Sequence, residues 1–139
     1  MNGAHEIGRI NHVGIAVRQI DEALGRWTPW LGTPIRPPEV VPSQRVRVAF
    51  LQVGESRIEL LEPTQPDSPV GRFLDQRGEG MHHLAFSVAS VDRALAEVAR
   101  SGGRLVDTVG RMGAGGHRVG FAHPSAFGGV LVEFVEASA

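Results

Sequence analysis

The sequence INHVGIAV, residues 10–17, has a near copy in MHHLAFSV, residues 81–88, which lies 71 positions later. Both are short apolar runs with a histidine at the same point, His12 in the first and His83 in the second. In a β-strand alternate side chains share a face, and a short apolar run of this length is typical of a strand. The repeat therefore predicts two strands, each with one imidazole, at equivalent places in two copies of one unit.

The similarity continues beyond these strands. Four more residues keep the spacing of 71, so that Asp21, Ala23, Leu24 and Gly32 match Asp92, Ala94, Leu95 and Gly103. The segment RVAF at 47–50 recurs as RVGF at 118–121, and IELLE at 58–62 recurs as VEFVE at 132–136 after a spacing of 74. Each copy has the pattern of one strand, one helix and about three strands. We therefore predict an α+β fold, in which two βαβββ modules form a curved eight-stranded mixed sheet around a metal site.

Turn-forming residues place the elements of the first module. We expect a loose leader over 1–8, and a helix that starts at Asp21 and kinks or ends near Pro29. An irregular, proline-rich stretch follows, and then a hairpin of two strands. The hairpin strands are predicted at 45–53 and 57–62.

The second module is predicted to repeat this plan. After the strand at 83–88, Ser90 caps a helix that ends at Gly102 and Gly103. A strand over 104–109, a glycine-rich loop over 110–116 and a hairpin complete the module, with the hairpin strands at 118–122 and 130–135. We expect a single domain, 1–139, with module 1 at about 9–65, a linker helix at about 67–78 and module 2 at about 80–137.

Composition excludes several classes of function. The chain has 139 residues, 42% of them hydrophobic and 21% charged, as in an ordinary globular domain. The net charge of −1 gives no indication of a nucleic-acid or anionic-membrane partner. All fourteen basic residues are arginine and there is no cysteine, so neither a lysine Schiff base nor a thiol nucleophile is available. The sequence shows no membrane-spanning run and no signal peptide, so we expect a cytoplasmic protein.

Superposition of the two repeats selects four residues for chemistry, because it pairs His12 with His83 and Glu59 with Glu133. Two imidazoles and two carboxylates suit a divalent first-row metal ion. Each glutamate is flanked by apolar residues, and a carboxylate there is costly to bury unless it is paired or metal-bound. The sequence therefore predicts a metal site built from these four side chains.

Other polar residues have two readings each. His82 points away from the face of His83 in a strand, which favours a structural role, and His117 and His123 fall in loop or hairpin positions. The sequence GAGG at 113–116 could cradle a phosphate or form a simple turn. Three arginines near the predicted hairpins could contact phosphate or be solvated strand ends: Arg45, Arg47 and Arg118.

Five segments carry a resemblance to a known family: NHVGIAV at 11–17, IELLEP at 58–63, DSP at 67–69, GEGMHHLAF at 78–86 and GGVLVE at 128–133. Together with two βαβββ modules, they resemble the vicinal oxygen chelate superfamily, which includes glyoxalase I, extradiol dioxygenases and bleomycin-binding proteins. Within it, the resemblance is greatest to the methylmalonyl-CoA epimerases.

The resemblance implies the glyoxalase/bleomycin resistance/dihydroxybiphenyl dioxygenase fold, with His12, Glu59, His83 and Glu133 as ligands of a divalent ion. Co²⁺ is the expected ion, with Ni²⁺, Zn²⁺, Mn²⁺ or Mg²⁺ as alternatives. It implies an isomerase of propionyl-CoA metabolism that interconverts (2R)- and (2S)-methylmalonyl-CoA by removing the α-proton through a metal-stabilised enolate. It also implies an acyl-CoA thioester substrate, a homodimer, and neither a nucleic-acid nor a membrane partner.

Epimerisation removes a proton from one face of a carbon and returns one to the other, so two acid–base groups are expected. Some members of the family carry a second carboxylate at a position that aligns with Val48, and residues 40–53 contain no Asp or Glu. Symmetry instead predicts Glu59 and Glu133 as the two catalytic residues. The open alternatives are a glyoxalase I-like lyase with the same four ligands, and a non-catalytic small-molecule-binding protein of the same fold.

Overall fold

The computed structural model describes residues 7–136, and the chain divides into two compact units. The amino-terminal unit is His12–His82, and the carboxy-terminal unit combines Met1–Asn11 with His83–Ala139. Two strands, β1 (Ile7–Ala16) and β5 (Gly80–Val88), therefore contribute residues to both units. The predicted module boundaries stay a prediction, since these units exchange the first parts of their first strands.

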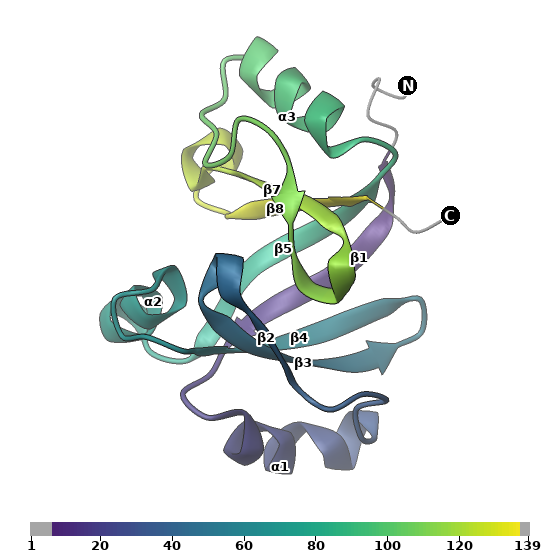
Figure 1. The fold of residues 1–139 in the computed structure, drawn as a ribbon, viewed down its shortest axis with the longest axis vertical. Helices are drawn as coiled ribbons and strands as arrows, with labels where there is room; N and C mark the ends of the chain where they lie inside the picture. The colour runs from purple at the N-terminus through teal and green to yellow at the C-terminus, as the bar shows by residue number, and fades with distance from the viewer. Residues whose placement is uncertain (1–6, 137–139) are drawn as a thin grey trace. The chain divides into compact units, whose positions relative to one another are not determined.

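The amino-terminal unit is a four-stranded mixed sheet with two helices (Figure 1). Its strand order is β2-β3-β4-β1, in which β1 runs parallel to β4 and the other pairs are antiparallel. After β1 its elements are α1 (Ile20–Leu31), β2 (Glu39–Val41), a 3₁₀ turn (Pro42–Gln44), β3 (Val46–Val53), β4 (Ser56–Pro63) and α2 (Pro69–Arg77).

The carboxy-terminal unit repeats this topology, with strand order β5-β8-β7-β6. Strand β5 runs parallel to β8, and β8-β7 and β7-β6 are antiparallel. After β5 its elements are α3 (Val91–Arg100), β6 (Arg111–Met112), a 3₁₀ turn (Ala114–Gly116), β7 (Arg118–Ala122), a second 3₁₀ turn (Pro124–Phe127) and β8 (Val132–Glu136). The predicted α+β class, with two βαβββ units and eight strands in a mixed arrangement, is confirmed.

One face of each sheet is covered by a helix. In the amino-terminal unit α1 packs on β3 and β4, where a buried cluster includes Ile20, Leu51 and Leu60. In the carboxy-terminal unit α3 packs on β7 and β8, where Leu95 and Phe134 belong to the equivalent cluster. Side chains alternate along a strand, so every second residue points to the opposite face. We call that opposite face of each unit its site face, because it carries the candidate ligands.

Several boundaries of the first module differ from the sequence expectation. Ile7 and Gly8 belong to β1 rather than to a leader, and the rest of the expected leader lies outside the described residues. Helix α1 begins one residue earlier than expected and continues past Pro29 to Leu31. Pro29 cannot donate to the carbonyl four residues before it, so the helix lacks that one bond, and it ends two residues later.

The strand predicted over 104–109 is wrong. That segment forms only an isolated bridge, between Leu105 and Ala122, and the outer strand is β6. The backbone N–H groups of Val106 and Asp107 both donate to the carbonyl of Phe121, and the Asp107 carboxylate accepts from Phe121 N at 2.9 Å. These bonds replace a regular ladder, so the apolar residues of this segment lie in a turn.

Within residues 7–136, each helix falls short of the length and hydrophobicity that a bilayer-spanning helix requires.

Candidate functional site

The first pair of candidate ligands lies on neighbouring parallel strands of the amino-terminal unit. In the register of β1 and β4, Gly14 lies opposite Glu59, which places His12 and Glu59 on the site face two positions apart. His12 Nε2 and Glu59 Oε1 are 3.0 Å apart, and the two residues are only 4% and 3% exposed. Gly14 is buried and carries no side chain, so it adds no bulk beside this pair.

The second pair repeats this geometry in the carboxy-terminal unit. Ala85 on β5 lies opposite Glu133 on β8, again two positions from the histidine. His83 Nε2 and Glu133 Oε1 are also 3.0 Å apart, and both residues are buried. The structure thus brings His12 together with Glu59 and His83 together with Glu133, as the repeat predicts for each module.

An aromatic ring lies against each of these histidines. Phe50 contacts His12 with ring centroids 5.9 Å apart and planes at 76°, and Phe121 contacts His83 at 5.5 Å and 82°. Both phenylalanines are cross-strand partners of the glutamates, because β3 and β4 pair Phe50 with Glu59, and β7 and β8 pair Phe121 with Glu133. The sequence comparison matches RVAF with RVGF but assigns these rings no role.

Each ring also carries a guanidinium on its face. Arg57 lies over Phe50 at 4.4 Å, and Arg111 lies over Phe121 at 5.6 Å. Such contacts are attractive because the face of an aromatic ring is electronegative. In both units, therefore, an arginine lies over the face of a phenylalanine, and that phenylalanine contacts a histidine edge to face.

The donor chemistry of the four residues fits a metal ion. Two imidazoles and two carboxylates, all buried, make a group able to hold one. A carboxylate taken out of water is unfavourable unless a cation or hydrogen-bond donors compensate it. Two ligand atoms that bind one ion at about 2.1 Å and at right angles lie about 3.0 Å apart. The spacing within each pair equals this value, so each pair can supply two neighbouring ligands.

A third carboxylate on the site face of the amino-terminal unit escaped the sequence comparison. Glu39 on β2 pairs with Val48 on β3, which lies on the same face as Phe50 and Glu59. Glu39 is exposed, whereas Glu59 is buried against its histidine. Glu39 lies just before the segment 40–53, in the proline-rich stretch that was expected to be irregular. A strand at 39–41 would have placed Glu39 beside Val48.

The last glutamate of each repeated IELLE-like segment caps a helix. Glu62 Oε1 accepts from the backbone N–H of Ile20, the first residue of α1, at 2.8 Å. Glu136 Oε1 accepts from Val91 N, the first residue of α3, at 3.0 Å. A carboxylate at a helix N-terminus satisfies an otherwise unpaired donor and interacts favourably with the helix dipole. The repeat therefore contains one glutamate on the site face and one that anchors the helix on the other face.

The other histidines have different surroundings. His82 lies against Phe73 of α2 at 5.0 Å, with planes at 73°, while its neighbour His83 pairs with Glu133. His123 caps the 3₁₀ turn that follows it, since its Nδ1 accepts from Ser125 N at 3.1 Å. Both contacts are structural in kind.

The arginines considered for phosphate binding have carboxylate partners. Arg45 bonds Asp67 at 2.8 Å, Arg118 bonds Asp92 at 2.8 Å, and Arg47 lies 3.7 Å from Glu62. The glycine-rich segment forms the 3₁₀ turn Ala114–Gly116, in which Gly116 N donates to Gly113 O. Of the two interpretations of this segment, the simple turn accounts for the hydrogen bond that it makes.

Two exposed carboxylates titrate at lower pH than usual. The pKa of Glu79 is lowered, first by the backbone N–H of Arg18, at 2.8 Å, and then by the Arg26 side chain. The pKa of Asp92 is lowered by the Gly110 N–H and by Arg118. In both cases the donors favour the ionised form.

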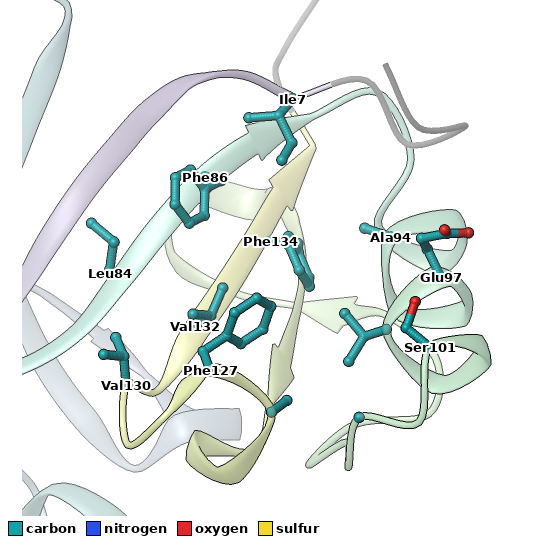
Figure 2. Close-up of a pocket in the computed structure, with 13 residues that line it drawn as sticks. Ile7, Leu84, Phe86, Ala94, Glu97, Ser101, Phe127, Val130, Val132 and Phe134 are labelled. Atoms are coloured by element: carbon teal, nitrogen blue, oxygen red, sulfur yellow. The ribbon is translucent and has the colours of Figure 1, made fainter. Parts of the chain in front are cut away.

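A cavity of about 500 Å³ lies on the helix-covered face of the carboxy-terminal unit (Figure 2). Leu84 and Phe86 of β5 and Val132 of β8 form its floor, and α3 and Phe127 form its walls. These strand residues alternate with His83 and Glu133, so the cavity and the candidate ligands lie on opposite faces of the same strands. The lining is apolar apart from Glu97 and Ser101, and it offers little for acid–base chemistry.

Known proteins are similar to this chain in sequence and in fold. The family model of the Glyoxalase/Bleomycin resistance protein/Dioxygenase superfamily matches residues 11–121. The chain is 36% identical over 132 residues to the mitochondrial methylmalonyl-CoA epimerase of Bos taurus, a match that covers 94% of this chain and 75% of that protein. It is 35% identical to the ethylmalonyl-CoA/methylmalonyl-CoA epimerase of Cereibacter sphaeroides, over 91% of this chain and 96% of that one.

A solved structure of a methylmalonyl-CoA epimerase in complex with methylmalonyl-CoA and NH₄⁺ is also similar. It is 38% identical in sequence and superposes with a TM-score of 0.90, covering 96% of this chain and 97% of that one. The family resemblance and the fold inferred from the sequence are thus confirmed.

Proposed function

Because the chain belongs to the glyoxalase/bleomycin resistance protein/dioxygenase superfamily, we propose that it is an isomerase that interconverts the (2R) and (2S) forms of methylmalonyl-CoA. The observation that carries the proposal is the repeated His–Glu pair, with 3.0 Å between Nε2 and Oε1 in both units. The similarity to methylmalonyl-CoA epimerases indicates the substrate, and the two His–Glu pairs provide the metal ligands and carboxylates that its epimerisation needs.

We propose that His12, Glu59, His83 and Glu133 hold a single divalent ion, with Co²⁺ as the preferred metal. Two nitrogen and two carboxylate donors suit a first-row ion, and burial of all four makes an ion the natural compensation for two buried negative charges. Such an ion would stabilise negative charge that develops on oxygen atoms of the substrate when the α-proton leaves. The protein's part is to hold the four donors in place, with the small residues Gly14 and Ala85 opposite the two glutamates.

The proton transfers fall to carboxylates. Glu133 is the proposed carrier in the carboxy-terminal unit. In the amino-terminal unit there are two candidates: Glu59, its counterpart by symmetry, and Glu39. Glu59 is buried against His12 in the same way as Glu133 is buried against His83, whereas Glu39 is exposed on the same face as Glu59 and has its carboxylate available for proton exchange. At the equivalent position of the other unit, Arg111 pairs with Val119, so a cation stands there in place of a carboxylate.

We further propose that the chain forms a homodimer. Three large apolar side chains of the carboxy-terminal unit, Ile7, Phe127 and Val130, are 51%, 43% and 45% exposed, and all three line the apolar cavity. Clustered exposed apolar surface is typical of protein interfaces. Sedimentation equilibrium should give twice the chain mass, and Phe127→Ser should shift the equilibrium toward the monomer. A parent protein that stays monomeric at high micromolar concentration would exclude the dimer.

The direct test of the activity is to incubate the Co²⁺-loaded protein with one epimer of methylmalonyl-CoA and to follow the other by chromatography. The same preparation is then given methylglyoxal and glutathione, whose adduct is the substrate of a glyoxalase I-like lyase. We expect epimerisation and no lyase activity. The reverse result would identify a lyase, and tight substrate binding without either reaction would identify a non-catalytic binding protein.

A further inference from the structure

We propose that Phe50 and Phe121 are positioning residues, which fix the planes of the His12 and His83 imidazoles and so aim Nε2 of each at the metal. The inference rests on the metal site proposed above and extends it to residues outside the ligand set. It starts from the two ring contacts, which join a phenylalanine to a candidate ligand within each unit at 5.9 and 5.5 Å.

The imidazole plane needs such a restraint. The torsion that rotates a histidine ring about its Cβ–Cγ bond has a broad, shallow preference, so the side chain alone does not fix where Nε2 points. A metal bond is directional and is weakened when the nitrogen lone pair is misaligned. Neighbours that fix the orientation of a ligand therefore contribute to metal affinity, and their loss typically weakens binding about 10- to 100-fold.

The geometry of the phenylalanines suits this task. The planes of ring and imidazole are nearly perpendicular, at 76° and 82°, which is one of the two favoured arrangements of aromatic pairs. Each phenylalanine is also the cross-strand partner of the glutamate in the same pair, Phe50 of Glu59 and Phe121 of Glu133. One residue thus contacts the histidine through its ring and lies directly across from the glutamate on the neighbouring strand.

The phenylalanine rings are themselves held. Arg57 and Arg111 place their guanidinium groups over the ring faces at 4.4 and 5.6 Å. Arg111 is in turn bonded to Asp107 at 3.1 Å, and Asp107 accepts from the backbone N–H of Phe121. The same arrangement occurs in both units although its arginine comes from β4 in one and from β6 in the other, which indicates that it belongs to the pairs and not to one local packing solution.

The test replaces each ring by an aliphatic side chain, in Phe50→Leu and Phe121→Leu. Metal affinity is measured by titrating the metal-free protein with Co²⁺ against a chelator, and the ligand geometry by the visible absorption spectrum of bound Co²⁺. We expect each variant to bind Co²⁺ about tenfold more weakly and with a changed spectrum. Phe50→Tyr and Phe121→Tyr keep the ring and should restore both properties.

The chain contains a matched control. Phe73 lies against His82 at 5.0 Å and 73°, with Arg77 over its ring at 5.4 Å, so Phe73→Leu removes the same kind of contact from a histidine outside the proposed site. This variant should keep the parental affinity and spectrum. Phe50→Met and Phe121→Met fill the space with a flexible apolar chain and provide the test where a leucine variant does not fold.

The outcomes separate the two proposals. Parental affinity and spectrum in both Phe50→Leu and Phe121→Leu, in a protein that binds Co²⁺, would overturn the positioning role and leave the metal site intact. An equal loss in Phe73→Leu would also overturn it, because the effect would then be one of general stability. A parent protein that binds no Co²⁺ would overturn the metal site, and the positioning role with it.

Discussion

The buried carboxylates decide the chemistry at the scale of single residues. Glu59 and Glu133 each lie 3.0 Å from an imidazole nitrogen, and Glu39 stands exposed on the same face as Glu59. A ligand and a proton carrier place different demands on a carboxylate. A carboxylate that only binds metal stays ionised and fixed, whereas a carrier gains and loses a proton in each turnover, and Glu133 is proposed for both roles.

Substitution by glutamine distinguishes these roles. Glu133→Gln should lower the rate of epimerisation by about 10²- to 10⁴-fold, because one proton transfer loses its carrier. Glu39→Gln should have an effect of the same order, while retaining the bound metal. Exchange of the α-proton in D₂O, followed by NMR for each epimer, should then continue from one epimer alone.

Glu59→Gln should act chiefly through metal affinity. If Glu59→Gln and Glu39→Gln both exchange the two epimers as fast as the parent, while Glu133→Gln is inactive, the scheme with a carboxylate on each side is wrong. If Glu39→Gln keeps full activity and metal-loaded Glu59→Gln does not, the symmetric assignment of Glu59 and Glu133 is correct.

Glu79 makes a pH-dependent contribution to stability. Its pKa in the folded protein is lowered below its usual value of 4.5, mainly by the Arg18 N–H. A lowered pKa means that the ionised form stabilises the fold above pH 4.5, and that this stabilisation is lost as the pH falls through the folded-state pKa. Denaturant unfolding should show Glu79→Gln to be less stable than the parent at pH 7 and equal to it near pH 3. A difference that stays constant with pH would contradict this, and Glu55→Gln, in an exposed turn, is the control.

Strands and helices are joined by the last glutamate of each repeat. Glu62 and Glu136 bond the first N–H of α1 and α3 and thereby fix each helix to the strand that also carries a candidate ligand. Glu62→Ala and Glu136→Ala should each lower the free energy of unfolding by about 1 kcal/mol. Glutamine at either position should recover part of this, since its amide oxygen still accepts the bond. Alanine variants with parental stability in urea unfolding would show that the caps are energetically neutral.

The helix-covered faces of the two units differ in side-chain size at a position where a helix packs closely on the sheet. Gly120 in the second unit corresponds to Ala49 in the first. A Cβ at Gly120 would lie 2.8 Å from Leu95 Cδ1 and 3.0 Å from Val91 Cγ1 of α3. Gly120→Ala should therefore cost about 1–3 kcal/mol of stability through overpacking. An unchanged unfolding free energy would mean that α3 moves away at little cost.

The helices and strands were predictable where the sequence showed a repeating pattern or a helix-capping residue. The repeat gave both first strands, and Ser90 caps α3 as expected, with its hydroxyl accepting from Arg93 N at 3.2 Å. Prediction was wrong where tertiary contacts replaced local ones. The apolar residues of 104–109 indicated a strand, but hydrogen bonds to Phe121 bend that segment. The strand β2 is too short to show an alternating hydrophobic pattern, so the sequence alone did not place Glu39 beside Val48.

At the scale of the whole molecule, duplication supplies the proposed metal site without a cysteine ligand. Each unit carries half of the proposed donor set, and neither His–Glu pair alone completes the four ligands. The sequence could nominate the four residues because an internal repeat acts as its own alignment. The sequence could not show that a phenylalanine ring contacts each histidine or that a guanidinium group lies over each phenylalanine, because those contacts depend on pairing between strands.

The most direct measurement is the number of Co²⁺ ions bound per chain, obtained by titrating the metal-free protein and by elemental analysis after gel filtration. One ion per chain is predicted, with loss of that ion in His12→Ala and equally in His83→Ala, because each unit supplies half of the ligands. Two ions per chain, or retention of the ion at parental affinity in either variant, would mean that the pairs act separately and would contradict the shared site.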